Sequence, residues 1–167
     1  MLDIPLLLGF IPVDFWGIQA ASHYKVPIYG WVLKKYGNLP IDRSSPRASF
    51  KTMMEAVEHI KAGKNIMILP EGTRTKTPPV MGEFKKLPFM MAKKGQVGII
   101  PIGFVGLSEL NNTSSWIMRP GKMRMVFGEP IDASVVEALS EVELRELARE
   151  RIQALLEEAQ RLEQASS

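Results

Sequence analysis

Residues 69–74 carry the side chains best suited to chemistry, in the order Leu-Pro-Glu-Gly-Thr-Arg. They continue an apolar run, 66–69, that predicts a buried strand. Gly72 allows the backbone to approach a ligand closely, and successive amides after a strand can bind an anion. Arg74 offers a planar guanidinium that suits phosphate, and Glu71 can orient a hydroxyl or hold an arginine. The stretch indicates a site for an anionic, hydroxyl-bearing ligand such as a phosphorylated alcohol, with an ordinary strand-to-loop turn as the alternative.

Further basic residues are expected near the same place. Arg43 ends a short extended segment, and in a parallel sheet the strand ends converge on one edge, where ligands bind. Arg43 and Arg74 are therefore expected to hold one phosphate from two loops, although a surface pair of Arg43 with Asp42 is the alternative. Lys85 and Lys86 would add positive charge to this site, or they form the solvated start of a helix.

The segment 39–69 predicts the framework that positions these loops. Ser45 can cap a helix whose first position is Pro46. Apolar residues recur at helical spacing on one face of that helix: Phe50, Met53, Met54, Val57 and Ile60. Gly63 ends the helix, and a strand follows at 65–69. The resulting strand–helix–strand order is typical of a parallel crossover unit and favours α/β architecture.

The remaining chain supplies further elements of the same kind. A short helix and then a strand at Trp16–Ala20 are expected within 4–22, and a helix at 27–37 ends in a basic turn before Gly37. A helix at 84–94 is ended by Gly95, and a strand at 98–105 is interrupted by Pro101. A half-buried strand is expected at 122–127. Ser140 and Glu143 form a capping box for an amphipathic final helix, whose inner face is Leu144, Leu147, Ala148, Ile152, Leu155 and Leu156.

Composition limits the class of protein. With 167 residues, 46% of them hydrophobic and 23% charged, the chain has the size and make-up of one folded globular domain. It contains no cysteine, which excludes disulfides and thiol catalysis. A net charge of +3 and a pI of about 9.2 suit a phosphate ligand or an anionic membrane surface, and are too weak to indicate nucleic acid.

The start of the chain is apolar but too short to span a membrane. Residues 4–13 are uncharged and contain two prolines and a glycine, whereas a spanning helix needs about 20 apolar residues. They predict either a buried part of the core or a surface that touches lipid. No basic region of a signal peptide precedes them.

The two histidines are not expected to be catalytic. His59 falls near the end of the helix at 46–62, where it complements the helix dipole, and His23 falls in a polar turn. No metal-ligand spacing and no Gly-x-Ser-x-Gly nucleophile motif occurs. A nucleotide-binding domain is disfavoured because the glycine-rich phosphate motifs are absent.

Five blocks of the sequence occur in a recognisable order: 37–43, which ends in Asp-Arg; 69–74; the Gly-Glu-Phe-Lys-Lys of 82–86; the proline-centred 99–102; and the Phe-Gly-Glu-Pro-Ile of 127–131. Together they resemble the lysophosphatidic acid acyltransferase family over about residues 3–160. The resemblance implies an α/β domain with a mixed, mostly parallel sheet flanked by helices, like that of glycerol-3-phosphate acyltransferases.

The resemblance also implies an activity. A fatty acyl group would pass from coenzyme A or acyl carrier protein to the free hydroxyl of a lysophospholipid such as 1-acyl-glycerol-3-phosphate, with no metal or cofactor. Asp3 and Glu71 are then the candidate catalytic residues. The candidate substrate-binding residues are Arg43, Gly72, Thr73, Arg74 and Lys85. The expected location is the cytoplasmic face of a membrane, as a peripheral protein of a bacterial inner membrane.

The resemblance departs at the first block. In the family a His-x4-Asp motif supplies a histidine base that the aspartate orients. Asp3 matches the aspartate, so the histidine would stand five positions earlier, before Met1. Residues 1–167 are thus expected to be one acyltransferase domain without its histidine segment, and to transfer little or no acyl group. Three explanations stay open: an incomplete or misassigned start, which we favour, deliberate trimming, or a pseudoenzyme that binds lipid phosphate at a membrane surface.

Overall fold

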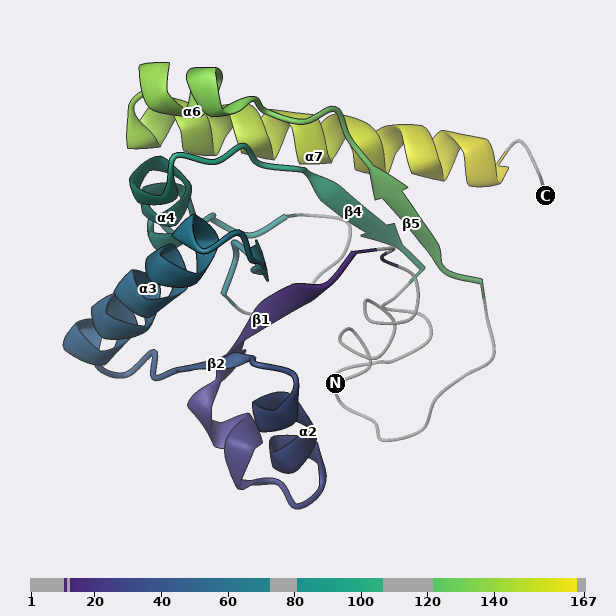
Figure 1. The fold of residues 1–167 in the computed structure, drawn as a ribbon. Coiled ribbons are helices and arrows are strands. Elements are labelled where there is room, and N and C mark those ends of the chain that lie inside the picture. The colour runs from purple at the N-terminus through teal and green to yellow at the C-terminus, as the bar shows by residue number, and fades with distance from the viewer. Residues whose placement is uncertain (1–10, 12, 73–80, 107–121, 165–167) are drawn as a thin grey trace.

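A three-stranded parallel sheet and an antiparallel strand pair organise the fold. The computed structural model describes residues 11, 13–72, 81–106 and 122–164. The parallel sheet has the order β2-β1-β3, with β1 at Phe15–Ala20, β2 at Leu39–Ile41 and β3 at Asn65–Met67. β4 (Ile102–Val105) and β5 (Arg124–Phe127) form the antiparallel pair. The α/β class is confirmed, and in the described residues the parallel and antiparallel strands form two sheets instead of one mixed sheet (Figure 1).

Strand β1 lies at the centre of the parallel sheet. Its second half pairs with β2, from Ile18 opposite Leu39 to Ala20 opposite Ile41. Its first half pairs with β3, from Phe15 opposite Asn65 onward. The predicted crossover of 39–69 is confirmed, with β1 inserted between its two strands. The predicted strand at 65–69 is shorter than expected, because Ile68 and Leu69 already lie beyond the ladder.

Helix α3 (Pro46–Lys61) joins β2 to β3 and buries one face against the sheet. Ser45 Oγ accepts a hydrogen bond from the Ala48 amide at 3.2 Å, so the predicted N-cap is confirmed. The prediction for Phe50 is wrong, because its side chain is 48% exposed. The helix is rotated so that Thr52 Oγ1 donates to Pro40 O at 2.8 Å and Ser49 Oγ donates to Asp42 O at 2.7 Å. These bonds bring small polar residues to β2 and turn Phe50 outward.

Of two glycines that were predicted to end helices, Gly37 does so and Gly95 does not. α2 (Tyr29–Lys35) ends as expected, since Gly37 has a φ of 72° and the next amide, of Asn38, donates to Leu33 O. α4 (Leu87–Gly95) does not, because the left-handed residue is Gln96, with a φ of 54°. Gly95 is needed for packing instead, since a Cβ there would lie 2.6 Å from Ile60 Cγ2 of α3.

α4 also begins later than the predicted residue 84. The Lys85 amide donates to Pro70 O at 2.8 Å, which keeps the chain extended up to that point. Proline in the first turn of α4 then suits a helix start at Leu87.

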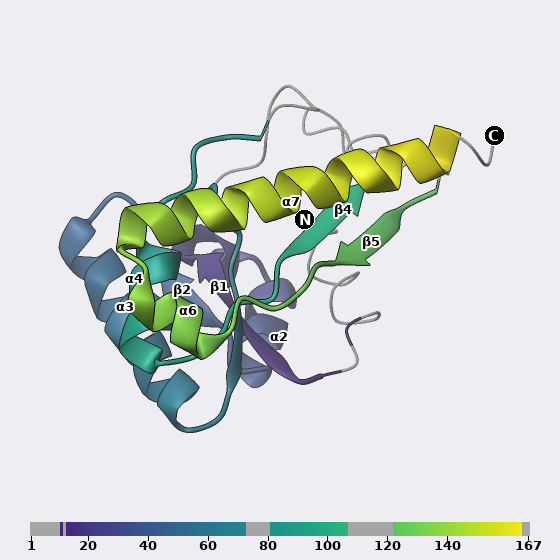
Figure 2. The ribbon, with the colours of Figure 1, turned by 90° about the horizontal axis from the view of Figure 1, so that it is seen from above.

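The C-terminal part covers the second sheet. α7 (Glu141–Gln164) crosses β4 and β5 and reaches the α4 end of the molecule, as Figure 2 shows. The capping box is confirmed, because the Ser140 amide donates to Glu143 Oε2 at 2.8 Å and the Glu143 amide donates to Ser140 Oγ at 3.3 Å. The predicted inner face is also confirmed, with Leu144 and Ala148 fully buried.

Pro101 and two short helices complete this region. The buried Pro101 separates the isolated Ile99–Ile131 bridge from β4, and its carbonyl accepts from the Gly128 amide. The 3-10 helix η1 (Ala21–Lys25) stands where the sequence indicated only a turn, and α6 (Ala133–Ala138) was not expected. Lys93 of α4 holds the end of α6, because its ammonium donates to the carbonyls of Val136, Glu137 and Leu139.

The α3–α4 contact makes a testable prediction. Gly95→Ala should destabilise the protein by about 1–3 kcal/mol through overpacking, although alanine is the better helix former. The free energy of unfolding in urea measures this. In an Ile60→Ala background, where the contacting Cγ2 is gone, the same change should cost clearly less, and an equal cost in both backgrounds would contradict the packing explanation.

Candidate functional site

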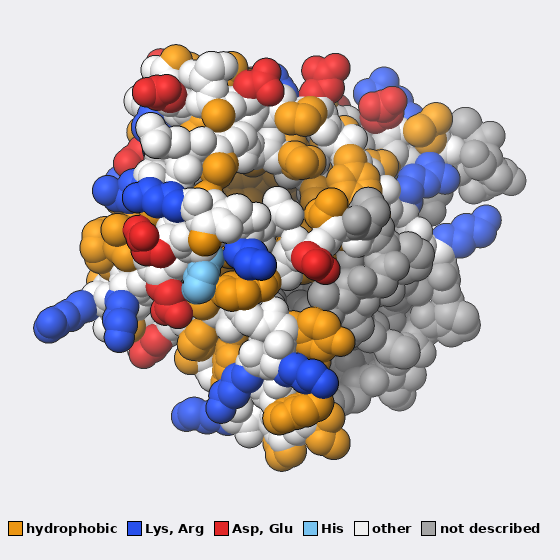
Figure 3. Space-filling view, in the orientation of Figure 1, with side chains coloured by type: hydrophobic (Ala, Val, Ile, Leu, Met, Phe, Trp, Pro, Cys, Tyr) orange, Lys and Arg blue, Asp and Glu red, His pale blue; other side chains and the backbone are white. Residues whose placement is uncertain are grey.

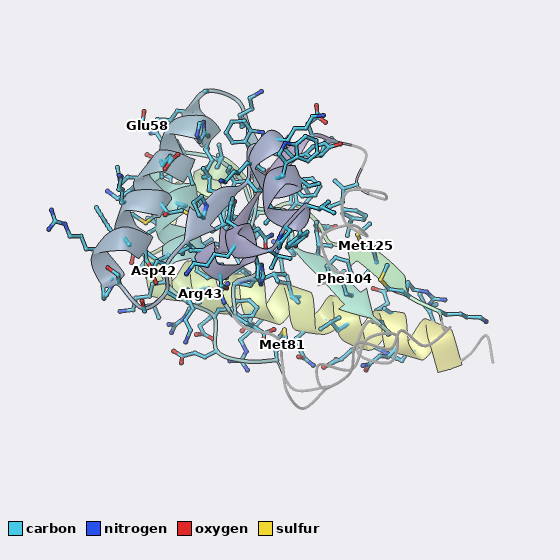
Figure 4. The ribbon with its side chains drawn as sticks, turned by 90° about the horizontal axis from the view of Figure 1, so that it is seen from below. Asp42, Arg43, Glu58, Met81, Phe104 and Met125 are labelled. Carbon is cyan, nitrogen blue, oxygen red and sulfur yellow. The ribbon has the colours of Figure 1, made fainter. Side chains whose placement is uncertain are left out.

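The candidate site lies where two outer strands leave the parallel sheet. Arg43 follows β2 by two residues, and Pro70 follows β3 by three. Because Ala20 pairs with Ile41 and β3 runs alongside β1 in the same direction, both loops leave at the carboxyl edge of the sheet. Figure 4 shows Arg43 and Met81 on the same side of the molecule, and Glu58 on the opposite side. Arg43 is exposed to solvent there.

The turn after β3 is held at both ends. Gly72 has a φ of 71°, and its amide donates to Leu69 O at 3.0 Å. Glu71 Oε2 accepts from the Gly82 amide at 2.9 Å, so residues eleven positions apart are joined at the base of the loop. With Lys85 N bonded to Pro70 O, two hydrogen bonds close the loop that leaves β3 and returns to α4.

Buried side chains fix the returning end of the loop. Met81 and Phe84 belong to the same hydrophobic cluster as Phe89 of α4 and Leu144 of α7. They flank Gly82, whose close approach needs the absence of a side chain, since a Cβ there would lie 2.7 Å from Glu71 Oε2. Lys85 is exposed, and its Cγ would lie 3.6 Å from a Cβ at Gly72. The Lys85 side chain thus leaves the backbone beside the predicted anion-binding turn.

The turn after β2 has its own internal order. Asp42 Oδ1 accepts from the Ser44 amide at 3.0 Å and from Ser44 Oγ at 2.6 Å. These two hydrogen bonds lower the pKa of the Asp42 carboxyl below its ordinary value, and the bond from the Ser44 hydroxyl has the larger effect. No ion pair joins Asp42 to Arg43 in this described turn, so the alternative interpretation of Arg43 as half of that pair is wrong. The guanidinium is left at the sheet edge.

The structure brings together part of the predicted residue set. Glu71, Gly72 and Lys85 are adjacent, and Arg43 lies at the same sheet edge. Asp3, Thr73 and Arg74 lie outside the described residues, so their roles stay predictions.

Two positioning residues were missed by sequence reasoning. The Asp-x-Ser spacing of a side-chain-capped turn could have identified Ser44. Gly82 stood within a recognised block, but a hydrogen bond across eleven residues leaves no local signal.

His59 lies away from this edge, whereas His23 follows the carboxyl end of β1 by three residues. α3 starts beside Arg43, and His59 is thirteen residues further along from Pro46, about 20 Å at 1.5 Å per residue. Its ring contacts Trp16 edge-on, with centroids 4.4 Å apart. His23 lies in η1, with its ring centroid 6.0 Å from that of Tyr29.

Comparison with known proteins decides the family. The sequence profile of the Acyltransferase family matches residues 1–105, which is more than half of the chain. The chain belongs to the acyltransferase family. The matched range includes both turns of the sheet edge, and the resemblance inferred from the motif blocks is confirmed.

Relatives of this acyltransferase chain share one name. The chain is 32% identical over 139 residues to the chloroplastic 1-acyl-sn-glycerol-3-phosphate acyltransferase LPAT1 of Arabidopsis thaliana. The match covers 83% of this chain and 38% of that protein. It is 31% identical over 111 residues to the 1-acyl-sn-glycerol-3-phosphate acyltransferase of Pseudomonas aeruginosa, covering 65% of this chain and 42% of that one. The chain thus spans about two fifths of the length of these relatives.

A solved structure shows the same fold. The crystal structure of the 1-acyl-sn-glycerophosphate acyltransferase PlsC from Thermotoga maritima matches with a TM-score of 0.81 and 30% identity, covering 96% of this chain and 62% of that one. No helix among the described residues of the acyltransferase chain is long and apolar enough to cross a bilayer.

The Glu71–Gly82 bond can be tested directly. A hydrogen bond to a charged group is worth about 1.5–3 kcal/mol, so Glu71→Ala should speed hydrogen exchange of the Gly82 amide by about 10–150-fold. Glu71→Gln, which keeps a neutral acceptor, should have a smaller effect. The exposed neighbour Glu83→Ala is the control. Unchanged exchange at Gly82 in Glu71→Ala, measured by NMR, would show that the carboxylate does not hold the loop.

Proposed function

We propose that this chain is the part of an O-acyltransferase that binds the acceptor, a lysophospholipid such as 1-acyl-glycerol-3-phosphate. The observation that carries the proposal is the shared sheet edge, from which Arg43 and the Glu71–Lys85 turn both leave in a chain of the acyltransferase family. The names of its relatives, 1-acyl-sn-glycerol-3-phosphate acyltransferases, support the same acceptor. A phosphate monoester beside one guanidinium and one ammonium would have charge-assisted partners from two loops.

The proposed reaction forms an ester and releases a thiol. The free hydroxyl of the lysophospholipid attacks the carbonyl carbon of the acyl thioester, and a general base takes its proton. The C–S bond breaks, and the thiolate receives that proton, so that phosphatidic acid and the free thiol are formed. Arg43, Lys85 and Arg74 hold the phosphate, and Gly72 and Thr73 line the glycerol portion. Glu71 keeps this turn in place and positions the acceptor, while Asp3 orients a histidine base five residues before it.

The proposed donors are acyl-coenzyme A or acyl-acyl carrier protein, which serve as co-substrates, and no cofactor or metal is invoked. The acceptor is a membrane lipid, so the protein would work at a membrane surface. The proposed location is peripheral, on the cytoplasmic face of a bacterial inner membrane, where water-soluble acyl thioesters and the lipid acceptor can meet.

Arg43 provides the first test of this proposal. Arg43→Ala should weaken binding of 1-oleoyl-glycerol-3-phosphate, presented below its micelle concentration, by about 10–150-fold, the range for a lost charged hydrogen bond. Ligand-dependent thermal stabilisation measures the change. Arg47→Ala, an exposed arginine in the first turn of α3, should bind like the unchanged protein. Equal binding by the two variants would remove Arg43 from the site.

The base provides the second test. A chain extended to carry histidine five positions before Asp3 should release thiol from acyl-coenzyme A only when lysophosphatidate is present. Alanine at that position should lower the turnover by at least the 10²–10⁴-fold typical of general-base assistance. Equal turnover with histidine and alanine would contradict the assigned base. Binding without turnover in either protein would favour a non-catalytic lipid-phosphate binding protein.

A further inference from the structure

The segment around α2 exposes an unusual concentration of large apolar side chains. Ile28 is 80% exposed, Trp31 63%, Tyr36 56% and Val26 38%. We call these four residues the α2 apolar patch. Figure 3 shows orange side chains at the lower end of the molecule, over α2 in Figure 1, with blue lysine or arginine side chains beside them. Clusters of exposed apolar side chains rimmed by charge mark surfaces that bind a partner or a membrane.

The backbone at Ile28 is strained, and the strain holds this side chain in solvent. Its φ is 63° and its ψ is −56°, a conformation that β-branched residues rarely adopt. The Tyr29 amide donates to Pro27 O at 2.6 Å, which makes a three-residue γ-turn of the strained kind around Ile28. Burial of Ile28 in the core does not compensate for this cost, because the side chain is exposed. Strain of this kind is retained where the surrounding structure imposes it and a function uses it.

The opposite side of α2 is tightly packed, so the patch is not a loosely attached helix. A Cβ on Gly30 would lie 2.4 Å from Tyr24 O of η1, and Leu33 is 1% exposed. The buried Asn38 side chain donates to Leu33 O at 3.2 Å and accepts from the Gly17 amide of β1 at 2.8 Å. These contacts fix the rotation of α2 about its axis. Trp31 therefore points outward because the packing requires it.

The chain segment that carries the patch has charged side chains of one sign. No Asp or Glu occurs from Phe15 to Ile41, and the three charged side chains in that stretch are the exposed Lys25, Lys34 and Lys35. Lys35 Nζ lies 5.0 Å from the ring centroid of Trp31, so a cation lies directly beside this aromatic ring. Tryptophan and tyrosine favour the headgroup level of a bilayer, and lysines beside them attract anionic lipid.

We propose that the α2 apolar patch is a membrane-docking surface that inserts Ile28 and Trp31 into the interfacial layer of an anionic bilayer. The lysines would contact lipid phosphates while their aliphatic stems lie along the apolar surface. The inference rests on the proposed function, since a lipid acceptor gives the surface its purpose. η1 connects β1 to α2 and contacts β2, so docking through α2 would bring the carboxyl edge of the sheet to the lipid.

Vesicle binding tests this proposal. The chain should co-sediment with vesicles of phosphatidylglycerol and phosphatidylcholine and much less with phosphatidylcholine alone, and added salt should weaken the binding. Lys34→Gln with Lys35→Gln should lower the partition coefficient by about 10–30-fold, at roughly fivefold per lysine. Trp31→Ser should lower it at least fivefold. Trp31→Phe should retain binding and remove most of the blue shift in tryptophan fluorescence on mixing with vesicles.

A matched control is available on α7. Val142 is 55% exposed, but its neighbours are Glu141 and Glu143, so Val142→Ser should leave vesicle binding unchanged. Failure of the unchanged chain to bind anionic vesicles would overturn the proposal, as would binding by Trp31→Ser and by the double lysine variant that equals binding by the unchanged chain. So would a dimer in sedimentation velocity that Trp31→Ser dissociates, because the patch would then bind a second copy.

The two proposals fail separately. Trp31→Ser and the double lysine variant should keep the stabilisation by monomeric lysophosphatidate, whereas Arg43→Ala should keep vesicle binding. Loss of lysophosphatidate binding in Trp31→Ser, with circular dichroism unchanged, would place Trp31 in the acceptor site and contradict a role confined to docking.

Discussion

Pairing of β1 on both of its edges sets the position of every described candidate site residue. β2 bonds to the second half of β1 and β3 to the first half. The staggered register brings the turns after β2 and β3 to one edge, although Arg43 and Gly72 are 29 positions apart in sequence with helix α3 between them. Buried hydrophobic residues of α3 keep this stagger, since Met53, Ala56 and Val57 are almost fully buried. A change of register in either strand would shift the turn that carries Arg43 relative to the turn at Gly72.

Two hydrophobic clusters fix the two sides of the candidate site. The cluster under α3 supports β1 and β2, and therefore the Arg43 turn. The cluster under α7 contains Met81 and Phe84, and therefore fixes the chain as it returns from the loop. α4 contributes to both, through Met91 on one side and Phe89 on the other. The close contact of Gly95 with Ile60 lets α4 join the clusters, because it allows the two helices to approach without an intervening side chain.

Features set by residues close together in the sequence were predicted better than features set by contacts between distant elements. The Ser45 cap, the Ser140–Glu143 box and the Gly37 stop depend on atoms a few residues apart, and all three are confirmed. Phe50 and Gly95 were assigned wrongly because their environments depend on how α3 meets β2 and α4, which helical periodicity does not contain. In the candidate site, the motif blocks predicted Glu71, Gly72 and Lys85, which the structure places next to one another. The hydrogen-bond partner of Glu71 is a backbone amide eleven residues away. Every non-proline residue has such an amide, so the sequence does not indicate which one Glu71 binds.

The loop that begins after Gly72 is closed at its base by the bonds of Glu71 to Gly82 and of Lys85 to Pro70. Both hydrogen bonds use residues outside 73–80. Changes of sequence or length within 73–80 would therefore leave these two anchors and the strands of the parallel sheet unaltered, so members of the family can vary that segment without rebuilding the fold.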